Sequence, residues 1–368
     1  MNAVELRHEL HKIPEIALKE FKTTELLISE VEKLEGIKIH RPCETGFLAE
    51  YTVNNGEYLL YRADIDALNI KEETGWEYAS ENGNMHACGH DIHMSVLFGF
   101  LKKVAEEKPD QNILFFFQPA EEGAGGAKIF IDTGIFDKFN IKNAFALHVN
   151  DFYDEHTVAF NGSVLFASAM EITISFKGIA AHVASPQDGK NTLNAMRTFM
   201  DMMERLPKDP VSPVLFGIGR FHTGEVRNII PASGKIEGSL RSLNMETSQR
   251  YFEELIKIGK AIQDSTGVEV LVEKNVFYPE VKNNYHLFHD LYELLEKKFS
   301  IIETEYKMTG EDFGFFTRMF PSVMYWLGTG KEKRVGLHNP EFLPSDDVIQ
   351  TGIDVNWEIL NYLSLIHI

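Results

Sequence analysis

The sequence of 368 residues contains only two cysteines, Cys43 and Cys88. Two cysteines are too few to hold together a chain of this length through disulfide bonds, and we do not expect them to pair with each other. Runs of eighteen apolar residues are also absent, and the opening segment MNAVELR lacks the basic region and apolar stretch of a signal peptide. These absences predict a cytoplasmic protein that does not cross a membrane.

Positive charge is scarce in this chain. Its 36 lysines and arginines are outnumbered by 55 aspartates and glutamates, which gives a formal net charge of -19 spread along the sequence. Because such a surface repels phosphate groups, nucleic acid is excluded as an expected partner. The hydrophobic fraction of 44% is that of a globular protein with a substantial core, and the length favours two domains over one.

Apolar residues in the first part of the sequence alternate between helical and strand-like spacing. Helical spacing extends from about residue 4 to residue 34 with an interruption at Pro14, and a further helical pattern follows His90. Short apolar segments predict strands at 46–51, 58–64 and 113–117, and the last is apolar throughout, as in a strand covered on both faces. The alternation predicts an α/β domain with a mostly parallel sheet.

The pattern changes near residue 168. Strand-like and helical segments predict a separate α+β domain with a four-stranded sheet and two helices. The strands fall at 170–176, 234–241 and 268–273, and the helices at 192–206 and 247–265. Because the α/β pattern resumes afterwards, we interpret residues 168–277 as an insertion, and residues 1–167 and 278–368 as one domain to which His338 returns.

The motif MHACGHD at 85–91 is the first candidate for a functional site. A lone cysteine or histidine is more often a packed core residue than a ligand. Here Cys88 and His90 flank Gly89, whose conformational freedom permits a tight turn that directs both side chains at one ion. Asp91 follows as a residue that can orient a ligand. The grouping favours a metal site over core packing.

Glu121 and Glu122 follow the predicted strand 113–117, at the carboxyl end where α/β sheets build their sites. Adjacent acids are usually a solvated charge pair. At a strand end, however, neighbouring side chains can diverge. One can then bind metal while the other acts as a base on water.

Further candidates stand at His148 and His338. His148 ends an apolar run, where a core histidine is the alternative, and His338 lies in the turn-rich segment 336–340. Asp64 and Asp66 share one face of a predicted strand end and can orient a ligand. Thiolate, imidazole and carboxylate together suit zinc and its transition-metal neighbours, whereas magnesium and calcium prefer oxygen ligands. The set predicts a hydrolase site built around divalent metal.

Several motifs in the chain resemble those of the metal-dependent amidohydrolases, a metallopeptidase family that includes hippurate hydrolases, auxin-conjugate hydrolases and N-acetyldiaminopimelate deacetylases. They cover essentially the whole sequence: RADIDA (62–67), MHACGHD (85–91), FQPAEEG (117–123), ALH (146–148), VRNIIP (226–231) and MTGEDFG (308–314). Within the family, the segments LHKIPEI (10–16) and FKT (21–23) look most similar to those of the N-acetyldiaminopimelate deacetylases.

The resemblance implies one or two ions of zinc, manganese, cobalt or nickel, bound by Cys88, His90, Glu122, His148 and His338. It also implies that Glu121 is the general base and acid. In the wider peptidase superfamily a His-x-Asp motif supplies one ligand and a catalytic aspartate, and Arg62 and Asp64 stand at the matching positions here. The ligand histidine is therefore missing. Asp64 keeps its catalytic role by analogy, and we expect Cys88 to compensate.

The inserted domain carries further positions of the family. His182, in KGIAAH, stands where relatives have a glycine-richer segment, and the resemblance implies that it reaches the partner's active site in a homodimer and stabilises the oxyanion. Asn228 and Arg241 resemble positions that contact the substrate carbonyl or carboxylate. The alternatives for these two are a turn asparagine and a surface arginine.

The resemblance implies deacetylation of N-acetyl-LL-2,6-diaminopimelate, a step towards lysine and cell-wall precursors. The same chemistry on another small N-acyl amino acid, such as hippurate or an acetyl-lysine-like substrate, stays open. A noncatalytic metal-binding or peptide-binding module is a hypothesis of a different class. Glu121 argues against it, because a degenerate site has no use for a base beside a full ligand set.

Overall fold

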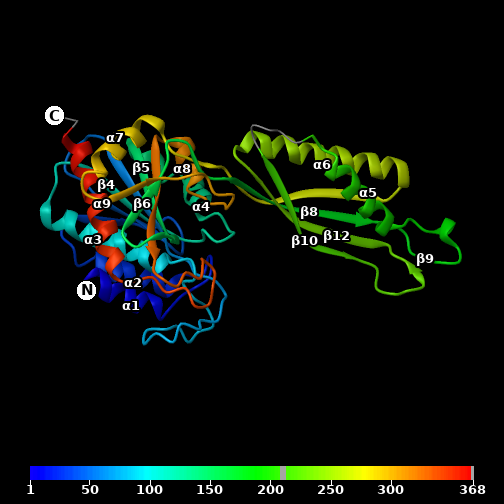
Figure 1. Cartoon of the computed structure of the whole chain (residues 1–368), viewed down its shortest axis with the longest axis horizontal. Coiled ribbons are helices and arrows are strands. Elements are labelled where there is room, and N and C mark those ends of the chain that lie inside the picture. The colour runs from blue at the N-terminus through cyan, green and yellow to red at the C-terminus, as the bar shows by residue number, and fades with distance from the viewer. Residues whose placement is uncertain (208–212, 366–368) are drawn as a thin grey trace. The chain divides into compact units, whose positions relative to one another are not determined.

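The computed structural model describes residues 1–207 and 213–365, which form two compact units (Figure 1). Unit 1 holds the described residues of Met1–Leu165, Val281–Tyr306 and Asp312–Ile368, and unit 2 holds those of Phe166–Glu280 and Lys307–Glu311. The range 168–277, predicted for the inserted domain, lies within unit 2. The return of Lys307–Glu311 to unit 2 was not part of that prediction.

Unit 1 is built on an eight-stranded sheet in the order β1-β2-β4-β3-β5-β16-β6-β15. The central strands β4, β3, β5 and β16 run parallel, whereas β1–β2, β2–β4 and β16–β6 are antiparallel pairs. The sheet is therefore mixed, and the predicted parallel pairing holds for its centre and for the β6–β15 pair at its end. One reason is that the loop between β1 and β2 is too short for a parallel crossover. The strands are β1 Ile37–His40, β2 Phe47–Tyr51, β3 Tyr58–Asp64, β4 Asn112–Gln118, β5 Ile141–Asp154, β6 Thr157–Phe160, β15 Ser300–Glu303 and β16 Ser322–Gly330.

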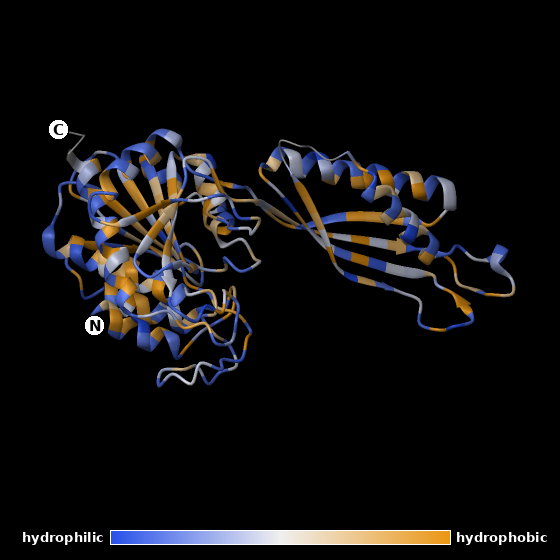
Figure 2. Ribbon diagram, viewed as in Figure 1, coloured by the Kyte–Doolittle hydropathy of each residue, from blue (hydrophilic) through white to orange (hydrophobic). Residues whose placement is uncertain are grey.

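Helices cover both faces of this sheet, and its central strands are mostly hydrophobic (Figure 2). Phe115 of β4 packs against Phe100 of α3 with ring centroids 5.5 Å apart, while its neighbour Phe116 packs against Phe130 of α4 at 4.7 Å. Because successive strand residues point to opposite faces, the run at 113–117 is covered on both sides, as predicted. The helices of unit 1 are α1 Ala3–His11, α2 Phe21–Val31, α3 His90–Glu107, α4 Gly126–Asp132, α7 Tyr285–Leu295, α8 Gly314–Met319 and α9 Asp347–Leu365.

Unit 2 contains an antiparallel sheet in the order β10-β12-β8-β13, with α5 and α6 packed on one face (Figure 1). Ile172, Ile174 and Phe176 of β8 are buried against these helices, and the residues between them are more exposed. The four-stranded sheet with two helices agrees with the prediction. The elements of unit 2 are β8 Ser168–Lys177, α5 Thr192–Glu204, β10 Val214–Thr223, β12 Ser233–Ser242, α6 Met245–Thr266 and β13 Glu269–Tyr278, with the short pair β9 Ala181–His182 and β11 Ile229–Ile230. A further short pair joins β7 Val164–Phe166 with β14 Val281–Lys282, where the chain passes from one unit to the other.

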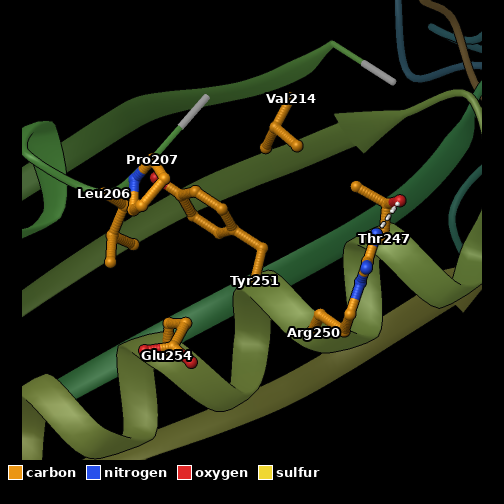
Figure 3. Close-up of a pocket in the computed structure, with 7 residues that line it drawn as sticks. All are labelled: Leu206, Pro207, Val214, Thr247, Arg250, Tyr251 and Glu254. Carbon is orange, nitrogen blue, oxygen red and sulfur yellow. Dashed lines mark hydrogen bonds between the residues drawn. The ribbon is translucent and has the colours of Figure 1, made fainter. Parts of the chain in front are cut away.

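A hollow of about 400 Å³ lies in unit 2 between the start of α6 and the chain at Pro207 and Val214 (Figure 3). Arg250 on its wall donates a hydrogen bond to Thr247 Oγ1 at 2.9 Å. Its described lining includes none of the residues that the sequence predicts for a site. Over residues 1–207 and 213–365, no helix is long and apolar enough to cross a membrane.

A buried charge network connects α1 with the start of α3. Arg7 Nε donates to Asp91 Oδ2 at 2.9 Å, and Arg7 Nη1 donates to Asp346 Oδ1 at 2.6 Å. His11 Nδ1 lies 2.8 Å from Asp91 Oδ2, and its Nε2 lies 3.1 Å from Glu72 Oε1. Burial lowers the pKa of His11, but the carboxylates of Asp91 and Glu72 outweigh burial and raise the pKa to about 9.

This pKa predicts a pH-dependent stability. A histidine whose pKa rises from 6.5 in the unfolded chain to about 9 in the fold stabilises the fold fully below pH 6.5, and this contribution is lost as the pH rises through about 9. The variant H11Q removes the charge. Between about pH 6 and about pH 10, we expect the difference in unfolding free energy between wild type and H11Q to shrink by about 3 kcal/mol in urea titrations. A constant difference would contradict a charged His11.

Candidate metal centre

The five predicted metal ligands all lie in unit 1. Their ligand atoms form two groups that share one sulfur: Cys88 with His90 and His148, and Cys88 with Glu122 and His338. Within each group all ligand atoms lie within 4.8 Å of one another. Residues up to 250 positions apart in the sequence therefore converge on a single thiol.

Cys88 is buried at the centre of this cluster. Its Sγ lies 3.4 Å from His148 Nε2 and 3.4 Å from His338 Nε2. His338 Nε2 lies in turn 3.3 Å from Glu122 Oε1. Burial, together with the carboxylates of Glu122, Glu121 and Asp64, raises the pKa of the Cys88 thiol well above its usual value. A thiolate at this position therefore requires a cation beside it.

His90 and His148 each direct one ring nitrogen at the cluster around Cys88. His90 Nδ1 lies 2.9 Å from the backbone oxygen of Asp66, a contact that assigns the proton to Nδ1. His90 Nε2 is buried and has no hydrogen-bond partner. His148 Nδ1 lies 2.8 Å from the Val149 oxygen, and its Nε2 lies 3.4 Å from Cys88 Sγ. A buried nitrogen without a partner, beside a thiol and carboxylates, fits a transition-metal ligand.

The charges around His90 point to a cation as well. Burial lowers the pKa of His90, but Asp64, Asp66 and Glu122 outweigh burial and raise the pKa to about 10. These carboxylates thus create a negative potential in the buried site. A bound divalent cation would neutralise this potential in place of a proton.

The turn after β4 presents the two glutamates. Ala120 has a φ of 58°, and its backbone N–H donates to Glu20 Oε1 at 2.9 Å. The N–H of Glu122 donates to Asp66 Oδ2 at 2.9 Å. Two buried carboxylates therefore hold the backbone on either side of Glu121. Burial, with the nearby charge of Asp66, raises the pKa of Glu20 to about 7.

Glu121 itself is buried, with 7% of its surface exposed. One of its oxygens lies within 4.8 Å of ligand atoms of His90 and Glu122. A carboxylate this close to a metal cluster can accept a proton from a water at the same site. The adjacent glutamates otherwise fall into different groups: Glu122 groups with Cys88 and His338, and Glu121 groups with Asp312.

Asp64 belongs to a hydrogen-bonded chain next to the ligands. Arg62 Nη1 donates to Asp64 Oδ2 at 2.8 Å, and Arg62 Nη2 donates to Asp312 Oδ1 at 2.9 Å. Burial raises the pKa of Asp64, but the neighbouring His90 and His93 and the Arg62 guanidinium outweigh burial and hold the pKa well below its usual range. Arg62, at the position of the missing ligand histidine, therefore holds a carboxylate in place of a metal.

Sequence reasoning missed His93. Its Nδ1 lies 2.5 Å from Asp64 Oδ1, and its Nε2 accepts the Val149 N–H at 2.9 Å. Both ring nitrogens are thus occupied, so His93 connects Asp64 to β5 and is not a free ligand. The available signal was its spacing, since positions three apart on a helix share a face with His90.

His148 differs from its prediction in one respect. The sequence placed it at the end of a strand, but β5 continues from Ile141 to Asp154. The extension exists because β5 keeps pairing with β16 beyond His148, through Val149 and Asn150. The backbone of β5 is therefore paired with β16 both before and after His148.

The predicted residues of the insertion lie in unit 2. His182 is exposed on β9, with its Nδ1 accepting the Ala184 N–H at 3.1 Å. Asn228 lies beside it, because its backbone oxygen accepts the Val183 N–H at 3.1 Å. Arg241 on β12 lies 3.4 Å from Glu171 Oε1. His182 and Asn228 are thus neighbours within this unit.

Gly89 offers a test of how tightly the centre is packed. At its φ of 83°, an added Cβ would lie 2.3 Å from Val149 Cγ2, whereas Gly83 has a φ of 85° and open space. Alanine at either position costs roughly 1–2 kcal/mol through the backbone alone. G89A should lose more stability than G83A in urea titrations and should also bind zinc more weakly, because Cys88 and His90 must move. Equal losses with equal zinc affinity would show that the contact with Val149 is unimportant.

The chain is similar to known proteins over nearly its whole length. Residues 60–361 match peptidase family M20/M25/M40. An N-acetyldiaminopimelate deacetylase of Listeria monocytogenes serotype 4a (strain HCC23) is 36% identical over 360 residues, which cover 96% of this chain and 96% of the relative. A protein of the same name from Lactococcus lactis subsp. cremoris (strain SK11) is 33% identical and covers 98% of each chain.

Solved structures share the fold over nearly the whole length. The YXEP protein of Bacillus subtilis, a dinuclear metal binding peptidase, superposes with a TM-score of 0.83 at 25% identity and covers 98% of this chain and 97% of its own. Aminopeptidase PepT of Bacillus cereus gives 0.75 at 16% identity, with 97% of each chain covered, a likeness of fold alone. The resemblance that the motifs indicate is confirmed: the chain belongs to peptidase family M20/M25/M40.

Proposed function

We propose that this protein is a metal-dependent deacetylase that hydrolyses N-acetyl-LL-2,6-diaminopimelate to LL-2,6-diaminopimelate and acetate. The observation that carries the proposal is a buried carboxylate, Glu121, beside a full set of ligands around Cys88. The names of relatives that match 96% or more of this chain support the substrate. The reaction belongs to diaminopimelate and lysine biosynthesis, and we place it in the cytoplasm.

The ligand set supports two ions of zinc, manganese, cobalt or nickel. The two groups that share Cys88 would each hold one ion, and the dinuclear Bacillus subtilis protein supports this number. When bound, such ions lower the pKa of water to about 7 and act as Lewis acids on the acyl carbonyl.

The side chains carry the remaining steps. Glu121 takes the proton of the attacking water and later delivers it to the departing amine, so that acetate and a free amino group leave. Asp64, held by Arg62 and His93, keeps the ligands oriented from behind. Glu20 and Asp66 hold the turn on which Glu121 sits, so that its carboxylate stays directed at the site.

Unit 2 supplies the second half of the proposal. We assign it as the lid and dimerisation domain of a homodimer, in which His182 donates a hydrogen bond to the oxyanion in the partner's site. Asn228, which lies next to His182, and Arg241 would bind the carbonyl and carboxylate groups of the substrate. The exposure of His182 within its own unit fits a role outside that unit.

Acetate release tests the substrate. With manganese, zinc or cobalt added, we expect the protein to release acetate from N-acetyl-LL-diaminopimelate at a kcat/KM at least about tenfold above that for N-acetyl-lysine, and to cleave hippurate more slowly still. Equal or better turnover of the other substrates would agree with the proposed metal site but contradict a role in diaminopimelate and lysine biosynthesis. A metal-loaded protein without turnover would support a noncatalytic module.

The variant E121Q tests the assignment of the base, because it keeps the size of the side chain and removes the carboxylate that accepts the proton. The matched control is the variant E122Q. We expect E121Q to lose turnover by about a thousandfold or more while metal content stays that of the wild type. E122Q removes a ligand instead and should lose metal as well. Full turnover by E121Q would contradict the assignment of the base.

The partner role of His182 predicts complementation between inactive subunits. H182A and E121Q are each expected to be inactive alone. In a mixed dimer, the H182A subunit provides Glu121 and receives His182 from its partner, so one complete site forms. Mixing the two after subunit exchange should restore up to about a quarter of wild-type activity.

Absence of recovery in a mixture that contains dimers of one H182A and one E121Q subunit would place His182 in its own subunit's site. An active protein that sediments only as a monomer would remove the partner role altogether. An affinity tag carried by one of the two variants measures the share of mixed dimers and so gives the efficiency of exchange.

A further inference from the structure

The loop that carries His338 follows the central strand β16. It leaves β16 at Gly330 and reaches His338 through residues 331–337. The His338 side chain is 52% exposed, and its backbone has a φ of 62°, a conformation that non-glycine residues rarely adopt. The contacts of this imidazole with Cys88 and Glu122 are contacts with two further ligands of the proposed site, so the backbone of the loop must bring it there.

Asp151 provides the buried polar contact to this loop. Its side chain lies on β5, next to the loop, and the residue is 8% exposed. Asp151 Oδ2 accepts the N–H of Val335 and the N–H of Gly336, each at 2.8 Å. Both bonds are charge-assisted and end on one oxygen atom. Gly336 has a φ of 82°, so the chain turns sharply at this point.

Other contacts of the loop are a backbone hydrogen bond and an exposed ion pair. The backbone N–H of His338 donates to the Ala87 oxygen at 2.8 Å, which ties the residue to the neighbour of Cys88. Arg334 pairs with Asp154, whose side chain is 80% exposed, so this ion pair is screened by solvent. Asp151 is thus the buried carboxylate that acts on the loop just before the ligand.

The same strand carries another ligand. His148 lies on β5 with Asp151, and its Nε2 lies 3.4 Å from Cys88 Sγ, as does Nε2 of His338. β5 is fixed by its pairing with β16, whatever the state of the loop. Loss of Asp151 would therefore leave His148 in place and release only His338.

We propose that Asp151 is a positioning residue that sets the metal affinity of the group formed by Cys88, Glu122 and His338, without touching metal or substrate itself. The proposal rests on the two-ion site of the proposed function. It extends that function by assigning the affinity of one ion to a carboxylate outside the ligand set.

Metal titration of the full-length protein tests the proposal. Zinc and manganese affinities are measured by competition with a chromophoric chelator for wild type, D151A and D151N. D151A should bind one ion on the order of tenfold more weakly and the other as wild type does. D151N keeps one oxygen where both N–H groups now donate, so it should recover most of the lost affinity. Turnover by D151A should recover when excess metal is added.

D154A is the matched control, since it removes a neighbouring carboxylate that contacts the same loop only through Arg334. Both of its metal affinities should equal those of the wild type. If D151A does not fold, D151S, whose hydroxyl is shorter than the carboxylate arm, replaces it. Wild-type affinity for both ions in a folded D151A or D151S overturns the proposal alone. If the wild-type protein binds only one ion, both the two-ion site of the proposed function and the positioning role of Asp151 are overturned.

Discussion

The site depends on buried negative charge that the protein neutralises only in part. Arg62 pairs with Asp64 and Asp312, whereas Glu122, beside the Cys88 thiol, has the imidazoles of His338 and His90 as its positive neighbours. Burying unpaired charge is costly, and in the absence of metal it is relieved by protons, as the raised pKa of Cys88 indicates. Metal binding replaces those protons, so affinity for a divalent cation follows from the charge distribution of the fold.

The parallel strands at the centre of unit 1 make this concentration of charge possible. β3 ends at Asp64, β4 leads into the turn of Glu121 and Glu122, and β5 carries His148, so that the predicted ligands and the proposed base meet at one edge of the sheet. The backbone there is held by side chains from distant segments. Glu20, for example, accepts from Ala120, 100 residues along the chain. Position is set by the sheet, and orientation by these long-range bonds.

Much of this arrangement could be predicted from local patterns in the sequence. The motif around Cys88 and His90, the strand before Glu121 and the period-two strand β8 could be predicted because spacing and neighbouring residues suffice to define them. The contacts of Glu20 and His93 could not, because each depends on a partner far away in the sequence. β10 was missed because Gly217 and Gly219 interrupt its alternation. The pairing of Arg62 with Asp312 could not be predicted either, because the two residues are 250 positions apart in the sequence.

The separation of Cys88 and His338 by 250 residues has a consequence during synthesis. Cys88, His90 and His148 are made before β16 and the loop of His338, and β5, which carries His148, pairs with β3 from the same early segment. His338 follows β16. A nascent chain can therefore bring the group of Cys88, His90 and His148 together before the group that needs His338, so that the two groups of ligands are completed in a fixed order.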